Sequence, residues 1–353
     1  MARIRFVLLQ SIVINLFFVA PFSTSTEFSD NLGSSHRHET SENDEQGNNI
    51  EINNKTTNTQ TSTQTTPTKT FESIYYNSEI MVNKTLSDEY WLDGKNFTVS
   101  QLLSTSVRKA IEVPLTFAFP YYGDPLHYII INSGGFLFTG GRDRAFLTRM
   151  QYIAPLMMNF NASLSNVTTV KYSDNGTAFT VVWEKIPLQE KANKTLRLFT
   201  FGVTIHESGH ITFAYRVIPV PLNENLSSVL KVGLSDGYSF YKKMKPLNIS
   251  FLRADEYDVV KFDWEYIQNE TLIYNSPRPT CLQHTNCEAC VQPTENMSHW
   301  LKCSWCQAAK CCSSRSDRNK KKWDNNTCLG GISDAESCPA HNVSGFNEHT
   351  DIL

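Results

Sequence analysis

Two sets of residues in this chain have the types and the spacing that metal chemistry requires. The segment His206-Glu207-Ser208-Gly209-His210 fits the pattern H-E-x-x-H of zinc proteases. In that pattern two histidines on one helical face hold the metal, and the glutamate activates a metal-bound water. Two C-x-x-C motifs, Cys287/Cys290 and Cys303/Cys306, have the spacing of a four-cysteine zinc site.

The residues around the H-E-x-x-H motif favour a β-hairpin over a metal-binding helix. Gly209 disfavours a helix, and apolar residues alternate with period two on both sides of the turn Glu207-Ser-Gly. Each strand places its apolar residues on one face: Phe199, Phe201, Val203 and Ile205 in the first, and Ile211, Phe213, Tyr215 and Val217 in the second. Strand parity then puts both histidines on the polar face, and no third ligand follows in the H-x-x-H-x-x-G-x-x-H form. We therefore predict no catalytic residue and no metal at this motif, and we expect no cofactor.

All nine cysteines lie between Cys281 and Cys338. A segment of roughly 50–60 residues is close to the size at which apolar burial alone is marginal, so disulfides commonly supply the missing stability. In a secreted chain these thiols pair with one another, whereas in a cytosolic chain the two C-x-x-C motifs would favour zinc. The compartment therefore decides between a disulfide-stapled module and a metal site.

The N-terminal sequence and the sequons indicate secretion. Residues 1–26 combine two early arginines, a mostly apolar run and small residues at its end, as in a cleaved signal peptide. Residues 27–70 are polar and rich in Thr and Asn, so we expect a disordered stalk. N-glycosylation sequons occur at Asn54, Asn83, Asn96, Asn161, Asn166, Asn175, Asn193, Asn225, Asn248, Asn269, Asn296, Asn325 and Asn342.

The central part of the chain has the composition of a mainly β domain. From Phe71 onward, short runs of aromatic and β-branched residues are broken at short intervals by Gly, Pro, Asn and Asp. The whole chain has 32 Lys and Arg against 35 Asp and Glu, a net charge of −3, which implies no nucleic-acid partner.

Two resemblances, in the right order, cover residues 71–338. The segments FAFPYYG (117–123), SGGFLFTG (133–140), QYIAPLM (151–157) and KVGLSD (231–236) are close to segments of plexin domain-containing proteins, the tumour endothelial marker family. In that family they belong to a nidogen-like domain. The CSWC element at 303–306, the CSS after it and Trp323 resemble the PSI module of the same family.

The resemblance implies a mainly β architecture in which a nidogen-like β domain precedes a small disulfide-rich PSI (plexin repeat) module. The expected parts are a signal peptide 1–26, a stalk 27–70, the nidogen-like domain 71–276, the PSI module 281–338 and a tail 339–353. The PSI resemblance also implies the disulfides Cys281–Cys303, Cys287–Cys338, Cys290–Cys312 and Cys306–Cys328. Cys311 departs from that pattern and is a free thiol, an intermolecular link or a rival of Cys312.

A basic run follows Cys312 and could bind sulfated glycans or an anionic matrix. Short basic runs are more often solvated surface loops than binding sites, and we favour a solvated loop here. The run comprises Arg315, Arg318, Lys320, Lys321 and Lys322.

The resemblance implies a non-enzymatic extracellular glycoprotein that binds secreted or extracellular-matrix protein ligands, as cell-surface receptors of this family do. Other members continue into a transmembrane helix, and we find no such apolar run after the signal peptide here. We therefore expect a secreted product, or a cell-surface one if the chain is a truncated form of a single-pass membrane protein. The alternative is a structural matrix scaffold with Cys311 linking chains, and a zinc metalloprotease is a distant third.

Overall fold

The computed structural model describes residues 68–92, 96–141, 149–189, 196–244, 249–292, 301–328 and 330–339, all within one compact unit of the chain. The predicted signal peptide, residues 27–67 of the predicted stalk and residues 340–353 of the tail lie outside these ranges. So do the sequons at Asn54, Asn193, Asn248, Asn296 and Asn342. The described fold is mainly β and ends in a disulfide-rich region, which confirms the predicted fold class. Among the described residues, no helix combines the length and the apolar composition needed to cross a membrane.

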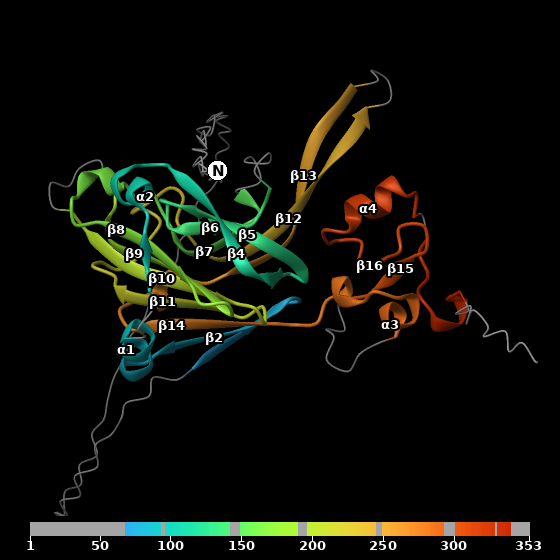
Figure 1. The fold of residues 1–353 in the computed structure, drawn as a ribbon, viewed down its shortest axis with the longest axis horizontal. Helices are drawn as coiled ribbons and strands as arrows, with labels where there is room; N and C mark the ends of the chain where they lie inside the picture. Colours follow the sequence, from blue (N-terminus) through green and yellow to red (C-terminus); the bar gives the residue numbers. More distant parts are fainter. Residues whose placement is uncertain are drawn as a thin grey trace, which may run out of the picture. The chain divides into compact units, whose positions relative to one another are not determined.

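Two antiparallel sheets form the body of the fold (Figure 1). The larger has the strand order β1-β2-β14-β11-β10-β9-β8-β3. Its strands are β1 (Lys69–Glu72), β2 (Tyr76–Val82), β14 (Thr271–Pro277), β11 (Ile211–Val217), β10 (Leu198–His206), β9 (Ala178–Pro187), β8 (Thr169–Asp174) and β3 (Thr98–Val99). The smaller has the order β13-β12-β7-β6-β5-β4. Its strands are β13 (Ile249–Lys261), β12 (Lys231–Met244), β7 (Tyr152–Met157), β6 (Phe136–Phe138), β5 (Asp124–Asn132) and β4 (Ala110–Tyr121).

The two sheets share one core that is rich in aromatic side chains. Trp183 of β9 stacks on Phe201 of β10 with ring centroids 5.3 Å apart, and its indole N–H donates to the carbonyl of Asn132 in β5 at 3.0 Å. The hydroxyl of Tyr215 in β11 donates to the carbonyl of Pro155 in β7 at 2.6 Å. Buried Trp and Tyr side chains need a partner for their polar atoms, and here that partner lies in the opposite sheet. The aromatic residues therefore fix how the sheets face each other.

The strand β10 is buried on both faces, not only on the face that its apolar alternation predicts. On the second face Thr200 and Thr204 are only 6% and 4% exposed. The helix α1 (Lys84–Leu92) covers part of this face, and the hydroxyls of Tyr90 and Thr204 are hydrogen-bonded at 3.0 Å. Alternation within one strand carries no information about a helix that packs on its outer face.

A β-bulge in β11 corrects the predicted orientation of Val217. Thr200 pairs with Val217, but the next residue, Phe201, pairs with Tyr215, so Arg216 is the extra residue. One extra residue reverses the alternation of faces beyond it. Val217 consequently lies on the outer face with Thr200 and is 40% exposed, whereas Tyr215 is fully buried.

The disulfide-rich region has a small core of its own. A hairpin of β15 (Ser304–Cys306) and β16 (Cys311–Ser313) packs with the helix α3 (Cys287–Val291), and α4 (Lys320–Asn325) follows. Trp305 and Ile332 exchange two backbone hydrogen bonds of 2.8 and 2.7 Å. Buried cysteines surround Trp305, so disulfides supply most of this core. The remaining short elements are α2 (Gln101–Thr105) and the 3₁₀ turns Ala162–Leu164, Trp264–Tyr266, Cys281–Gln283 and Ala335–Ser337.

Candidate functional site

The H-E-x-x-H segment forms the turn between β10 and β11, which confirms the predicted hairpin. The amide of His206 donates to the carbonyl of His210 at 2.9 Å, and the amide of Gly209 donates to the carbonyl of His206 at 2.8 Å. Gly209 has φ +88°, a left-handed conformation that suits glycine. The two histidines therefore sit across a hairpin turn and not one helical turn apart, so the geometry of a protease zinc site is not formed.

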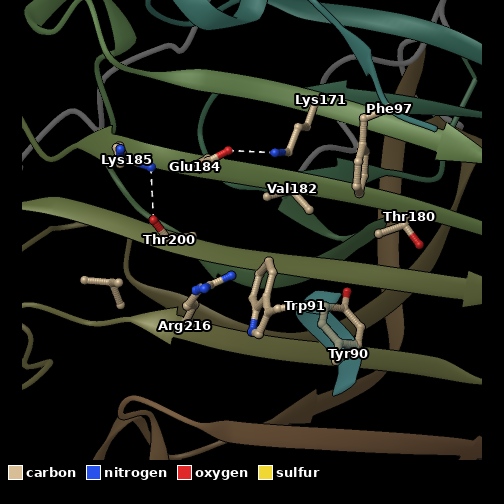
Figure 2. A pocket seen from close by; sticks show the side chains of 11 residues that line it. Tyr90, Trp91, Phe97, Lys171, Thr180, Val182, Glu184, Lys185, Thr200 and Arg216 are labelled. Atoms are coloured by element: carbon tan, nitrogen blue, oxygen red, sulfur yellow. Dashed lines mark hydrogen bonds and ion pairs between the residues drawn. The ribbon is translucent and has the colours of Figure 1, made fainter. Parts of the chain in front are cut away.

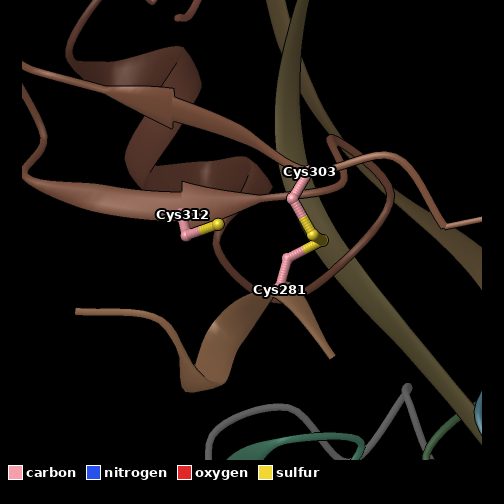
Figure 3. Close-up of side chains that lie close together, drawn as sticks. All are labelled: Cys281, Cys303 and Cys312. Carbon is pink, nitrogen blue, oxygen red and sulfur yellow. A yellow bond between two sulfur atoms is a disulfide. The ribbon is translucent and has the colours of Figure 1, made fainter. Parts of the chain in front are cut away.

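The cysteines form four disulfides, and these are the same pairs that the PSI resemblance implied: Cys281–Cys303, Cys287–Cys338, Cys290–Cys312 and Cys306–Cys328. Within the described ranges, the one group of three or more candidate metal ligands that lie close together is Cys281, Cys303 and Cys312, whose sulfurs are within 4.8 Å of one another. Figure 3 shows the bond between Cys281 and Cys303 with Cys312 beside it. Each of these sulfurs is bonded to another, and a disulfide sulfur does not serve as a thiolate ligand.

Cys311 is the cysteine without a disulfide in the described part of the chain. It lies on β16 next to Cys312 and is partly exposed. Burial raises the pKa of the Cys311 thiol above its ordinary value. A thiol with a raised pKa holds less thiolate at neutral pH and reacts more slowly. Among the three alternatives for Cys311, the structure has the free thiol, and Cys312 is the residue that pairs with Cys290.

One residue of the predicted basic run does not lie on the surface, whereas the other four are exposed or partly exposed. The guanidinium of Arg315 lies over the ring of Trp323 at 5.3 Å, and Lys320 forms an ion pair with Asp324 one turn along α4 at 2.6 Å. Lys321 and Lys322 are exposed. Arg318 is the exception, because its side chain is only 14% exposed and points into the fold. We therefore remove Arg318 from the candidate anion-binding residues.

Arg318 is held by carboxylates of the smaller sheet. Its Nε and Nη2 donate to the two oxygens of Asp236 at 2.7 Å each, and its Nη1 donates to Asp124 at 2.9 Å. The hydroxyl of Tyr257 also donates to Asp236, whose side chain is fully buried. This two-bond geometry is the strongest form of an arginine–carboxylate pair. The pair joins the disulfide-rich region to β12 and has a structural role.

Asp258 lies directly opposite Asp236 across β12 and β13, and its protonation gives a prediction. Burial raises its pKa to about 6, and the charges of Asp236 and Glu256 act in the same direction. The folded chain therefore keeps a proton that an unfolded Asp releases near pH ~4. Between the pKa of Asp258 in the unfolded chain and its pKa in the folded chain, the folded chain binds more protons than the unfolded one. The free energy of unfolding should therefore fall by about 1–2 kcal/mol as the pH rises from ~4 to ~6.5.

Asp258→Asn is expected to remove this part of the pH dependence, because its amide does not titrate. Urea unfolding of both chains at about pH 4.5 and about pH 7 tests the expectation. Equal slopes against pH in the two chains would contradict it.

The sequons differ in exposure, and Asn161 is the buried one among those described. Asn161 is 8% exposed, and its side-chain oxygen accepts from the amide of Ser163 at 3.1 Å and from the hydroxyl of Ser163 at 2.6 Å. Asn175 is exposed at the turn between β8 and β9. Asn96, Asn166, Asn225, Asn269 and Asn325 are also exposed, and Asn83 is half-buried.

We expect a glycan at Asn175 and none at Asn161, since a glycan requires surface space. When the chain is expressed in a host that N-glycosylates, Asn175→Gln should lower its apparent mass on a gel by the mass of one glycan. Asn161→Gln is the matched control and should leave the apparent mass unchanged. Peptide mass spectrometry that finds a glycan on Asn161 would refute this expectation.

Sequence reasoning did not find the pocket on the outer face of the larger sheet, which encloses about 310 Å³ (Figure 2). Strands β8 to β11 form its floor, Trp91 of α1 lies on one side, and Phe97 lies on the other. Lys171 of β8 forms an ion pair with Glu184 of β9 at 2.7 Å. Lys185 and Arg216 also line the pocket, which therefore holds three cations and one carboxylate.

Two bulges at the same level of the sheet produce this arrangement. Thr200 of β10 pairs with Val217 in β11, directly after the extra residue Arg216, and on its other side β9 places both Glu184 and Lys185 opposite it. Lys185 has φ +52°, an unusual conformation for a residue with a side chain, and its amide donates to the hydroxyl of Thr200 at 3.1 Å. Bulges commonly redirect side chains next to functional sites. The available sequence signal was the appearance of charges at 184, 185 and 216 within otherwise apolar strands.

A comparison with known protein families finds a match for part of the β region. The family model described as NIDO related matches residues 87–251, from α1 to the beginning of β13, and so includes the pocket. No solved structure matches the chain. Residues 87–251 are thus similar to the NIDO-related domains, which supports the expected nidogen-like domain and, more broadly, a protein of the extracellular type.

Proposed function

We propose that this chain is a non-enzymatic extracellular glycoprotein that resembles the ectodomain of plexin domain-containing receptors and binds secreted or extracellular-matrix protein ligands. In this proposal residues 71–276 are a nidogen-like ligand-binding domain, and residues 281–338 are a PSI module that serves as a rigid spacer. The observation that carries the proposal is one combination in one chain: a NIDO-related match at 87–251, followed by four disulfides among residues 281–338.

The covalent chemistry of the C-terminal region supports the extracellular part of the proposal. Disulfides form and persist in oxidising compartments and are rare in the cytosol. A module with a core made largely of cysteines and Trp305 would lose most of its stability if reduced. The proposed place of action is therefore the secreted fraction or, by the family resemblance, the cell surface.

Binding of the purified secreted chain to an immobilised basement-membrane extract tests the proposal. We expect saturable binding, with bound partners that can be identified by cross-linking and mass spectrometry. The matched control is the same chain after reduction and alkylation, which keeps its composition and charge and removes the stapled fold. Retention that does not saturate, or that is the same after reduction, would contradict a specific protein-binding role.

A further inference from the structure

We propose that the pocket on the outer face of the larger sheet binds an acidic saccharide, that is, a sugar ring carrying a sulfate or a carboxylate. The pocket is the one described above between α1, Phe97 and strands β8 to β11 (Figure 2). This inference goes beyond the proposed binding of protein ligands and does not depend on it. The protein-binding surface and the saccharide pocket can each be present without the other.

The positions of the cations point to an anionic ligand. Lys185 and Arg216 lie on opposite sides of Thr200, and each is in a bulge. The bulges bring both charges to one level of the sheet and into one pocket. Lys185 does so in a left-handed conformation that is unfavourable for a residue with a side chain. Strain of this kind persists where the surrounding structure requires it, and it clusters at ligand sites.

The ion pair within the pocket leaves a positive excess. Glu184 is paired with Lys171, and both side chains are largely shielded, with exposures of 35% and 25%. The remaining two cations of the lining, Lys185 and Arg216, are exposed to solvent. An arginine and a lysine that line the same pocket can each donate a charge-assisted hydrogen bond to a sulfate or a carboxylate bound there.

The aromatic side chains point to a sugar as the carrier of that anion. Trp91, Tyr90 and Phe97 line the pocket. The face of an aromatic ring carries negative charge density, which attracts the weakly positive C–H groups on the flat side of a pyranose ring. The guanidinium of Arg216 lies over the ring of Trp91, 5.8 Å from its centroid, so a charge and an aromatic ring adjoin each other in the pocket. A volume of about 310 Å³ lies at the lower end of the range for ligand pockets, which is ~300–1,000 Å³. It suits one or two sugar rings.

A nucleotide combines an anion with a flat ring and is the competing ligand class. Phosphate sites in nucleotide-binding proteins commonly use backbone amides at a helix N-terminus or a glycine-rich loop. The cations here come instead from side chains on strands. The oxidised cysteines also indicate an extracellular setting, where acidic saccharides are abundant, and we therefore favour the saccharide.

Titration of the full secreted chain with four probes tests the proposal: a heparin-derived tetrasaccharide, sialyllactose, lactose and AMP. We expect binding of the sulfated or the carboxylated probe that weakens with added NaCl, and the stronger of the two identifies the acidic group. Lys185→Gly and Arg216→Gln should each weaken that binding about tenfold or more, the effect of losing one charge-assisted hydrogen bond. Lys185→Gly removes the cation but suits the left-handed conformation, so its fold should be retained.

Lys261→Gln is the matched control, since Lys261 is an exposed cation of β13 outside the pocket, and it should not change the affinity. Thermal unfolding of each variant verifies that it is folded. The proposal is overturned if neither acidic saccharide binds, if lactose or AMP binds more tightly than both, or if Lys185→Gly binds the acidic probe as the parent chain does. It is also overturned if Lys261→Gln weakens binding as much as the pocket variants.

Discussion

Replacing Arg318 by methionine is expected to lower the free energy of unfolding by about 3–5 kcal/mol. The side chain of Asp236 is fully buried, and two of its hydrogen bonds come from the guanidinium of Arg318. Methionine retains much of the side-chain volume but donates no hydrogen bond. The carboxylate of Asp236 would then be a buried charge whose remaining donor in the described structure is the hydroxyl of Tyr257. Removing one partner of a buried pair costs far more than the pair itself contributes.

Arg253→Met is the matched control for this prediction. Arg253 also pairs with a carboxylate, that of Asp255 at 3.0 Å, but its side chain is 52% exposed. Water replaces the lost partner at an exposed site, so we expect a change of less than about 1 kcal/mol. Urea unfolding of the purified parent chain and of both variants measures the two effects. Similar midpoints for the two variants would show that Arg318 is not effectively buried.

A double substitution distinguishes loss of the ion pair from loss of packing. Asp236→Asn removes the buried charge while keeping the shape of the side chain and an acceptor for Tyr257. In the background of Arg318→Met it should therefore recover at least about half of the lost stability, because the cost arises from the unpaired carboxylate. No recovery would mean that the contacts of the arginine stem, and not its charge, account for the effect.

The alternation of apolar residues over short stretches of the sequence correctly predicted the strands that it covers. The period-two alternation between residues 197 and 217, with Gly209 in the middle, was sufficient for the β10–β11 hairpin. The same hairpin explains why the H-E-x-x-H motif does not form a protease zinc site. Its five residues form the turn, whereas the zinc site requires them in a helix. The four disulfide pairs came from family resemblance, because spacing alone leaves the connectivity of eight cysteines open.

The features that were missed depend on irregularities or on contacts that are distant in sequence. Arg318 reads as one member of a basic run, and its partner Asp236 is 82 residues away. Val217 fits the alternation of its strand until the bulge at Arg216 reverses it. A bulge inserts a single residue of no characteristic type, so the alternation of apolar residues does not predict its position. The pocket was missed for the same reason, because two such bulges bring its cations together.

Removing the disulfide Cys290–Cys312 by a double alanine substitution is expected to cost about 3–5 kcal/mol in the stability of the disulfide-rich region. The bridge closes a loop with a sequence separation of 22, for which the entropy of the unfolded chain alone accounts for about 3 kcal/mol. Both cysteines are also 1% exposed and pack in the small core around Trp305, so alanines leave a cavity in addition. Replacing both cysteines, and not Cys312 alone, prevents Cys290 from forming a new disulfide with Cys311.

Hydrogen exchange at the amides of Trp305 and Ile332 reports on this region specifically, because the two residues hydrogen-bond to each other. In the double variant we expect their protection to fall by roughly a hundredfold or more, the equivalent of 3 kcal/mol. Cys311→Ala is the matched control, since it removes a sulfur from the same strand without opening a bridge. It should reduce protection by less than about tenfold, in keeping with a partly exposed side chain. Equal protection in the two variants would mean that Cys290 and Cys312 are not bonded to each other in the folded protein, and that the core of this region is held by packing alone.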